Sequence, residues 1–398
     1  MRVATMSNGR YSLGEHHSIR SPNRISYGFG TVSELGSYAE GQGLESALLV
    51  TDADIVAAGV TDPVVDALER AGVAVDLFDG VEPEPKLSMV ADGVETLRAG
   101  EYEFVVGVGG GSVLDTAKLV SVVAEHDVEP ADTLGMGNAP GPGLALGLVP
   151  TTAGTGSEVT HIGVFTDDDG MKRVVYDDHL FADVVAVDPA LTASLPKRVA
   201  AATGLDALTH AIESYTSVLR TPYTDVLARD AIGRIGANLR GAVHQGEHND
   251  RARYEMLLGS TIAGQAFVNS GLGAVHALTY PIGIEFGVGH GEANAMLLPH
   301  VMAYNVPAEP ERYAAVADLL VPDATGSTRE RAEAGVDAVF SLTEDVGIPT
   351  SIGHLGEIDR ETLERFADVA FEYSRHNIDR NPRSLDREDV IEIYRSAR

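Results

Sequence analysis

Residues 104–120 read FVVGVGGGSVLDTAKLV, and this stretch decides the fold class. It begins with Phe104 and a run rich in valine, which predicts a buried strand, and the glycines that follow open a segment with helical spacing. Upstream, strands expected at 25–30, 46–50 and 73–78 alternate with helices expected at 32–41, 54–71 and 87–99. Alternation at these lengths predicts an α/β fold, a parallel sheet with helices on both faces.

The glycine run has a chemical interpretation as well as a structural one. Gly109, Gly110, Gly111 and Ser112 join the strand to the helix expected over 113–124. Such a loop lets the backbone approach a ligand and points helix N-terminal amides at it, as in a pyrophosphate site. The spacing is not G-x-G-x-x-G, and the run follows a later strand than the first, so the ordinary Rossmann fingerprint is not present. A tight strand-to-helix turn explains the same residues equally well.

A second loop of small residues follows a linker at 135–143 and a strand at 144–149. It reads PTTAGTGSE (150–158), and its hydroxyl groups could reach phosphate or ribose oxygens. A hydroxyl-rich turn is the alternative. Beyond it, a hairpin is expected around the acidic turn at 167–170, and the strand at 184–187 ends the sheet region.

From residue 196 onward the patterns become long and helical, and we expect the breaks formed by glycine and proline to fall only between helices. We therefore expect an α/β domain at 1–195 and an all-α domain at 196–398.

The expected helical domain contains a set of candidate metal ligands. Within GLDALTHAIE (204–213), Asp206 and His210 are four residues apart and therefore share one helix face. His276 and His290 follow in glycine-rich surroundings, where the backbone can turn a ligand inward. The chain has no cysteine, so a metal must use nitrogen and oxygen ligands, and this set suits Zn²⁺ or Fe²⁺. Singly, Asp206 could form a capping box with Thr203, and His210 could be a core histidine.

Composition limits the partners and the compartment. The 59 acidic and 29 basic residues give a formal charge of −30, which disfavours nucleic acid and anionic membranes as partners. No apolar run is long enough to span a bilayer and no signal peptide is visible, so we expect a cytoplasmic protein. Only four lysines occur, Lys86, Lys118, Lys172 and Lys197, and with this charge they suggest a halophilic protein whose self-repulsion is screened by salt.

With these motifs in order, together with GHGEANA (289–295), the chain resembles the iron-containing alcohol dehydrogenase family. The match runs from Tyr27 to Arg383. The resemblance implies an NAD-binding α/β domain, a helical metal-binding domain, and an active site in the cleft between them. It also implies a homodimer or larger assembly.

The family's functional positions can be carried over residue by residue. The resemblance implies metal ligands at Asp206, His210, His276 and His290. It implies cofactor contacts at Gly109, Gly110, Gly111, Ser112, Asp115, Thr151, Thr152, Thr155 and Lys172. Asp52 matches the position that faces the adenosine ribose, where a carboxylate accepts hydrogen bonds from free hydroxyls but repels a 2′-phosphate, so NAD is expected over NADP.

One position departs from many family members. Tyr280 lies four residues after His276, where they carry a second histidine near the substrate. A phenol, with a pKa near ~10, is a poorer proton shuttle at neutral pH, although some relatives that resemble hydroxyacid-oxoacid transhydrogenases also have tyrosine here. We take Tyr280 as the catalytic candidate. His376 and Asn377 are weaker candidates for the lining of a substrate pocket, and a surface loop is the alternative.

The resemblance implies reversible hydride transfer between an alcohol and its aldehyde or ketone, with NAD and one divalent metal, Fe²⁺ or Zn²⁺. The small-molecule substrate is an alcohol or a carbonyl compound. Three alternatives remain: a hydroxyacid-oxoacid transhydrogenase on the same fold, a lyase resembling dehydroquinate synthase, and a non-catalytic nucleotide-binding protein.

Overall fold

The structure is a computed structural model that describes residues 16–167 and 171–398. Its described residues form two compact units. The sheet unit consists of Ser21–Pro196 and Gly246–Gly264, and the helical unit consists of residues 16–20, Lys197–Gln245 and Gln265–Arg398. The domain division expected at residue 196 remains a prediction, because a unit defined by contacts need not fold independently.

The sheet unit is built on a six-stranded sheet in which every pair of neighbours is parallel. The strand order is β3-β2-β4-β6-β9-β1. The strands are β1 (Arg24–Tyr27), β2 (Ser46–Val50), β3 (Ala74–Phe78), β4 (Phe104–Gly109), β6 (Ala145–Pro150) and β9 (Val184–Val187). The helices between them are α1 (Ser33–Gln42), α2 (Ala53–Ala57), α3 (Asp62–Arg70), α4 (Leu87–Gly100) and α5 (Gly111–Ala124). The predicted α/β fold is confirmed.

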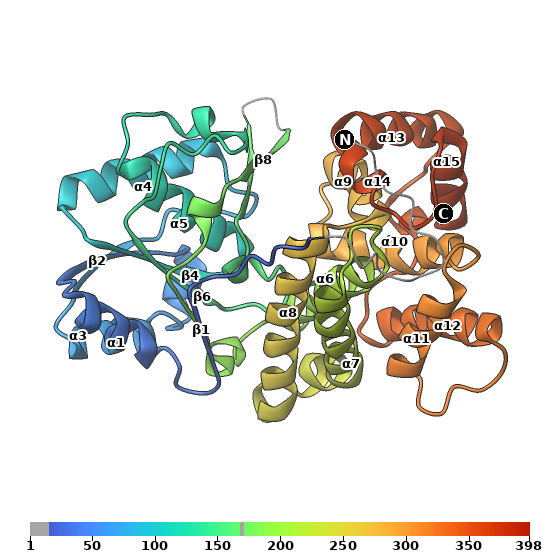
Figure 1. Cartoon of the computed structure of the whole chain (residues 1–398), viewed down its shortest axis with the longest axis horizontal. Helices are drawn as coiled ribbons and strands as arrows, with labels where there is room; N and C mark the ends of the chain where they lie inside the picture. The colour runs from blue at the N-terminus through green and yellow to red at the C-terminus, as the bar shows by residue number, and fades with distance from the viewer. Residues whose placement is uncertain (1–15, 168–170) are drawn as a thin grey trace. The chain divides into compact units, whose positions relative to one another are not determined.

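Helices cover both faces of this sheet (Figure 1). On one face, Leu35 of α1 and Leu68 of α3 belong to the same apolar core as Leu49 and Val106 of the strands. On the other face, a Cβ added to Gly107 would come within 2.8 Å of the Ala117 Cβ, so this glycine lets α5 approach β4 closely. Burial on both faces explains why the central strands are continuous apolar runs rather than alternating ones.

The helix expected over 54–71 was wrong as a single element, because the structure has two helices there, α2 and α3. Gly59 has a φ of +68°, which ends the first helix, and Pro63 occupies the first turn of the second. The apolar spacing continues across the break, so periodicity alone did not detect it.

A small second sheet carries the expected hairpin. Strands β7 (Ile162–Thr166) and β8 (Lys172–Tyr176) pair antiparallel, and β5 (Gly135–Met136) pairs parallel with β8. The expected linker at 135–143 therefore begins with a short strand. Most of the expected turn at 167–170 lies outside the described residues.

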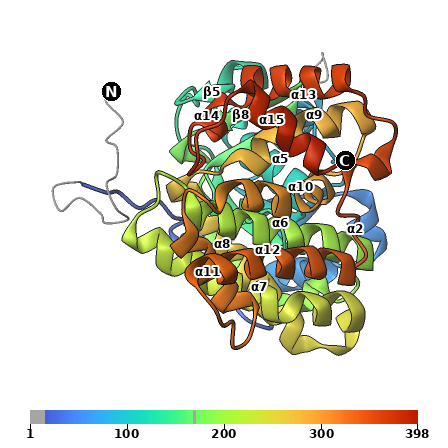
Figure 2. The same cartoon turned by 90° about the vertical axis from the view of Figure 1, so that its right-hand side faces the viewer.

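The rest of the chain is helical, and in the described residues no strand follows Val187. Helix α10 packs against α6, α9 and α12 (Figures 1 and 2). The helices are α6 (Lys197–Thr216), α7 (Pro222–Gln245), α8 (Asp250–Ser270), α9 (Ala274–Phe286), α10 (His290–Asn305), α11 (Pro310–Leu320), α12 (Thr328–Asp345), α13 (Arg360–Tyr373), α14 (Arg375–Ile378) and α15 (Arg387–Ser396). Within the described ranges, none of them combines the length and apolar character needed to cross a membrane.

Short 3-10 helices complete the secondary structure. They are η1 (Pro130–Thr133), η2 (Ser157–Val159), η3 (Asp178–Leu180), η4 (Pro189–Thr192), η5 (Gly246–His248) and η6 (Ile352–Leu355).

Candidate metal centre and cofactor loops

The first two candidate ligands lie inside the buried part of α6. Asp206 and His210 are one turn apart, and the Nε2 atom of His210 is 3.8 Å from the Oδ1 atom of Asp206. The helix begins at Lys197, so Asp206 is not a helix cap. The Thr203 hydroxyl donates to the carbonyl oxygen of Val199 instead. The capping-box interpretation of Asp206 was therefore wrong, and its carboxylate is free to serve another function.

The other two histidines come from α9 and from the first residue of α10. The Nε2 atoms of His276 and His290 lie 4.0 Å and 3.8 Å from the same Asp206 oxygen. Asp206 and His276 are buried, whereas the His290 side chain is 55% exposed. Each of the three imidazoles thus has its Nε2 atom 3.8–4.0 Å from one oxygen of Asp206. The ligand atoms of Asp206, His276 and His290 also all lie within 4.8 Å of one another, and His290 is open to solvent.

The arrangement fits a divalent cation. Metal–ligand bonds of about 2.0–2.1 Å place neighbouring ligand atoms roughly 3.3 Å apart in a tetrahedral site. The separations of 3.8–4.0 Å from the Asp206 oxygen need a contraction of about 0.5–0.7 Å. A set of three imidazoles and one carboxylate also suits a transition-metal ion better than it suits Ca²⁺ or Mg²⁺.

Burial and neighbouring charges shift the pKa values of Asp206 and His210, and the two effects oppose each other. Burial raises the pKa of Asp206, but the charges of the three histidines and a hydrogen bond from Asn294 oppose it and leave the pKa below the usual value. Burial lowers the pKa of His210 to about 4, although the Asp206 charge works against the shift. At neutral pH the centre therefore presents an ionised carboxylate and a neutral imidazole, which are the ligating forms of both groups.

Two residues at this centre were not predicted. Asn294, one turn after His290, donates from Nδ2 to the Asp206 carboxylate over 2.7 Å, and its buried Oδ1 atom has no hydrogen-bond partner. Glu213 lies 2.6 Å from the Nδ1 atom of His276. The sequence held a signal for both, because Asn294 is one helical turn from His290 and Glu213 is one turn from His210.

The two predicted cofactor loops lie side by side in the sheet unit. Gly110 is the N-cap of α5, with no side-chain capping bond, so the first amides of this helix are available to an anion. A Cβ on Gly110 would lie 3.5 Å from the Thr152 side chain, and one on Gly111 would lie 2.7 Å from that of Thr155. The Thr151 amide donates to the Gly109 carbonyl over 3.0 Å. The geometry fits the predicted pyrophosphate site, with Ser112 in the first turn of the helix.

Asp115 was predicted to contact the cofactor, but its carboxylate is occupied by contacts within the protein. Its carboxylate is buried and accepts hydrogen bonds from the Ser157 hydroxyl at 2.5 Å and the Val164 amide at 2.9 Å. The fully buried Lys118 ammonium contacts both Asp115 and Ser157. Burial lowers the pKa of Lys118, and the Asp115 charge opposes that shift. Asp115 thus links α5 to the loop at 150–158. Its predicted contact with the cofactor stays a prediction.

Asp52 and Lys172 occupy separate places in the same unit. Asp52 lies two residues after the end of β2, at the same end of the parallel strands as Gly109, and its Oδ1 atom caps α2 by accepting from the Ile55 amide. The Lys172 ammonium lies 2.9 Å from the Thr166 hydroxyl and 3.4 Å from the Glu84 carboxylate.

Tyr280 lies on α9, one turn after His276, and its ring packs against Tyr373 with centroids 5.9 Å apart. His376 and Asn377 belong to the short helix α14 and not to a loop, which was the alternative to a place in the substrate pocket. Burial lowers the pKa of His376, and the charge of Arg380 acts in the same direction. None of these contacts tests the predicted roles in proton transfer or substrate binding.

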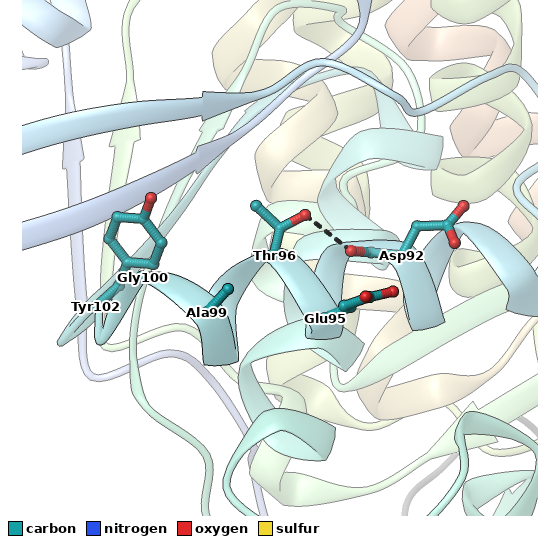
Figure 3. A pocket seen from close by; sticks show the side chains of 6 residues that line it. All are labelled: Asp92, Glu95, Thr96, Ala99, Gly100 and Tyr102. Atoms are coloured by element: carbon teal, nitrogen blue, oxygen red, sulfur yellow. Dashed lines mark hydrogen bonds between the residues drawn. The ribbon is translucent and has the colours of Figure 1, made fainter.

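One surface depression lies away from the residues predicted to be functional. It follows α4 and is lined by Asp92, Glu95, Thr96, Ala99, Gly100 and Tyr102 (Figure 3). The Thr96 hydroxyl bonds to the Asp92 backbone within the helix, and the lining includes two carboxylates. It includes none of the candidate ligands or cofactor residues.

Comparison with known proteins agrees with this geometry. The iron-containing alcohol dehydrogenase model matches residues 22–189, and the C-terminal model of the Fe-containing alcohol dehydrogenase family matches residues 200–398. Long-chain-alcohol dehydrogenase 1 of Geobacillus thermodenitrificans is 41% identical over 374 residues, 93% of this chain and 94% of that protein.

Two solved structures are similar along almost the whole chain. The structure of a 1,3-propanediol oxidoreductase has a TM-score of 0.92 and 37% identity, over 96% of this chain and 100% of that one. A sulfoacetaldehyde reductase from Bifidobacterium kashiwanohense, in complex with NAD⁺, has a TM-score of 0.88 and 30% identity, over 96% and 99%. The chain is therefore an oxidoreductase that belongs to the iron-containing alcohol dehydrogenase family, as its ordered motifs predicted.

Proposed function

We propose that this chain catalyses the reversible, NAD-dependent oxidation of a small alcohol to its aldehyde or ketone, with one divalent cation held by Asp206, His210, His276 and His290. The observation that carries the proposal is the convergence of three imidazoles on a single oxygen of Asp206, at 3.8–4.0 Å. The relatives support it, since they include alcohol dehydrogenases and a reductase solved with NAD⁺.

A cation bound there would act as a Lewis acid toward the substrate oxygen, favouring alkoxide character during oxidation and a polarised carbonyl during reduction. The protein's own groups do the rest. The neutral His210 and the ionised Asp206 offer ligands without first losing a proton. The exposed side of His290 leaves an approach for a small substrate. The Tyr280 hydroxyl is the proposed proton-carrying group, together with water and the cofactor ribose.

The cofactor would be held by backbone and hydroxyl groups of the sheet unit. The amides at the start of α5, at Gly111 and Ser112, would bind the pyrophosphate, and Thr151, Thr152 and Thr155 would contact phosphate or ribose oxygens. Lys172 is assigned to the nicotinamide ribose. Asp52 would accept hydrogen bonds from the adenosine ribose hydroxyls, and its charge favours NAD over NADP.

We further propose that Fe²⁺ and Zn²⁺ both fit the centre. The order of metal affinities favours Zn²⁺ over Fe²⁺ for the same ligands. The ion that a protein binds in the cell also depends on which metal is available, so metal supply decides which ion is found. The 59 acidic and 29 basic residues support a cytoplasm of high salt as the working environment. A homodimer or larger homo-oligomer is proposed from the family resemblance.

The test is elemental analysis of the purified protein combined with an NAD-reduction screen over primary alcohols, diols and hydroxy acids. We expect a divalent transition metal near one per chain and turnover with at least one alcohol. Turnover of a hydroxy-acid and oxo-acid pair without added NAD would instead indicate the transhydrogenase. Full turnover after removal of all metal would overturn the proposal.

A further inference from the structure

Glu213 is a buried carboxylate on α6 that faces the metal centre but is not one of its predicted ligands. It lies three residues after His210 and seven after Asp206, so the same helix face carries all three side chains. The Glu213 side chain is 5% exposed. A carboxylate this buried must be compensated by hydrogen bonds or charge, because its desolvation is costly.

Three donors surround the Glu213 carboxylate. The Val275 amide donates to Oε1 at 2.6 Å, the Gly273 amide donates to Oε2 at 2.9 Å, and the Nδ1 atom of His276 lies 2.6 Å from Oε2. These atoms come from a segment 60 to 63 residues away in the sequence. Glu213 therefore joins α6 to the start of α9, which carries the third ligand.

The bond to His276 selects one form of that imidazole. An ionised carboxylate only accepts hydrogen bonds, so the proton of neutral His276 must be on Nδ1. The lone pair is then on Nε2, the atom that faces Asp206 at 4.0 Å. Helix α6 thus supplies two ligands directly and orients a third through Glu213.

Capping of α9 is the simpler explanation, and it accounts for only part of the arrangement. The bonds from the Gly273 and Val275 amides satisfy the open N-terminus of that helix. A Cβ on Gly273 would come within 3.0 Å of Glu213 Oε1, so the glycine makes room for the carboxylate. A helix cap does not need the hydrogen bond to His276. At 2.6 Å that bond is as short as the one from the Val275 amide and shorter than the one from the Gly273 amide.

Charge gives a second reason for a carboxylate at this position. Asp206 and Glu213 together carry two negative charges, and the three imidazole ligands are uncharged when they bind a metal. A divalent cation therefore makes the buried cluster neutral. A centre without the Glu213 charge would have a net charge of +1 in a region where desolvation penalises net charge.

We propose that Glu213 is a positioning residue of the metal centre, which fixes His276 with Nε2 toward the cation and balances its charge. The proposal rests on the proposed function, in that a divalent cation occupies the four ligands. Outer-sphere partners of this kind typically change metal affinity by about 10- to 100-fold.

The experiment measures metal affinity in Glu213→Gln by competition with a chelator, using Zn²⁺ and Co²⁺. Glutamine has the same size and keeps one acceptor oxygen, but it carries no charge. Its NH₂ group would replace the oxygen that accepts from the Val275 amide, so that two donors would face each other. We expect about 10- to 100-fold weaker binding of both ions, and a changed visible spectrum of the Co²⁺ form. Glu213→Asp, which retains the charge, should recover part of the affinity.

Ser214→Ala provides a matched control on the same helix. The buried Ser214 hydroxyl pairs with that of Ser270 at 2.7 Å, so this variant also loses a buried hydrogen bond but has no link to a ligand. We expect it to lower the melting temperature of the metal-free and metal-loaded protein equally. Glu213→Gln should instead reduce the rise in melting temperature that metal produces.

The outcomes separate the two proposals. If wild type binds a divalent cation tightly and Glu213→Gln binds it equally well with an unchanged Co²⁺ spectrum, Glu213 is only a helix cap and the inference is wrong. If wild type binds no divalent cation, the proposed metal centre itself fails. Should Glu213→Gln not fold, Glu213→Asp decides, because its shorter side chain keeps the charge but draws the carboxylate away from the Nδ1 atom of His276. An affinity and a Co²⁺ spectrum identical to those of wild type would then show that this bond does not position the ligand, and the inference would be wrong.

Discussion

The Ser157 hydroxyl donates to the Asp115 carboxylate over 2.5 Å and joins the helix after the glycine run to the loop of threonines. The same hydroxyl lies 2.6 Å from the Lys118 ammonium. The contact therefore holds the two proposed cofactor loops together through a buried ion pair. Loss of the Ser157 hydroxyl should therefore lower the stability of the fold more than it lowers catalytic activity.

Ser157→Ala is expected to lower the free energy of unfolding by about 1–3 kcal/mol, because it leaves buried polar partners incompletely satisfied. Urea unfolding measures the change. Thr96→Ala removes a hydroxyl that makes a solvent-exposed hydrogen bond to the backbone of its own helix, and it should stay within roughly 0.5 kcal/mol of wild type. Equal effects of the two substitutions would contradict a special importance of the Ser157 contact.

Asp206→Ala should abolish metal binding and turnover together, because every other candidate ligand converges on the removed oxygen. The loss should exceed the roughly 10- to 100-fold effect of an outer-sphere partner. Elemental analysis and steady-state kinetics on the same preparation measure it. Metal-dependent turnover that survives the substitution would show that the ligand assignment is wrong.

Asp52→Asn tests the cofactor preference. The substitution keeps a side-chain oxygen that can accept from the Ile55 amide and so preserves the α2 cap, but it removes the charge. We expect the ratio of kcat/KM for NAD to that for NADP to fall about tenfold, the equivalent of ~1.4 kcal/mol of lost repulsion. A wild-type enzyme that prefers NADP would refute the role of Asp52 directly.

His300 should make the stability of the metal-free protein depend on pH. Its Nε2 atom lies 3.0 Å from the Thr350 carbonyl, and burial lowers its pKa from 6.5 while that hydrogen bond opposes the shift. As pH falls below 6.5, the unfolded chain takes up a proton before the folded one does, so stability declines on acidification.

His300→Gln should therefore flatten the dependence of the unfolding free energy on pH between about 7.5 and 5.5. Urea unfolding in the presence of a chelator measures it without interference from metal release. A slope that is the same in wild type and His300→Gln would contradict the assignment.

The formal charge of −30 leads to a prediction about salt. Screening of self-repulsion should raise the melting temperature of the metal-free protein by several degrees between low and molar KCl. Thermal melts in a chelator-containing buffer measure the effect. Equal melting temperatures at both salt concentrations would rule out adaptation to high salt.

The sequence alone determined the α/β class, the order of the motifs and the pairing of Asp206 with His210, because strand and helix periods are local properties that spacing reports directly. It did not reveal the break between α2 and α3, since the apolar pattern continues across Gly59. The sequence also offered His276 and His290 as candidate ligands, first by their glycine-rich surroundings and then by the family motif, but without their geometry.

Only the tertiary structure decided which distant groups meet. Asp115 turned inward to Ser157, Asn294 came to the Asp206 carboxylate, and Glu213 met His276 across 63 residues of sequence. The physical reason is that such contacts depend on how α6, α9 and α10 pack, and a helical period defines the face of a side chain but not the partner that the face will meet.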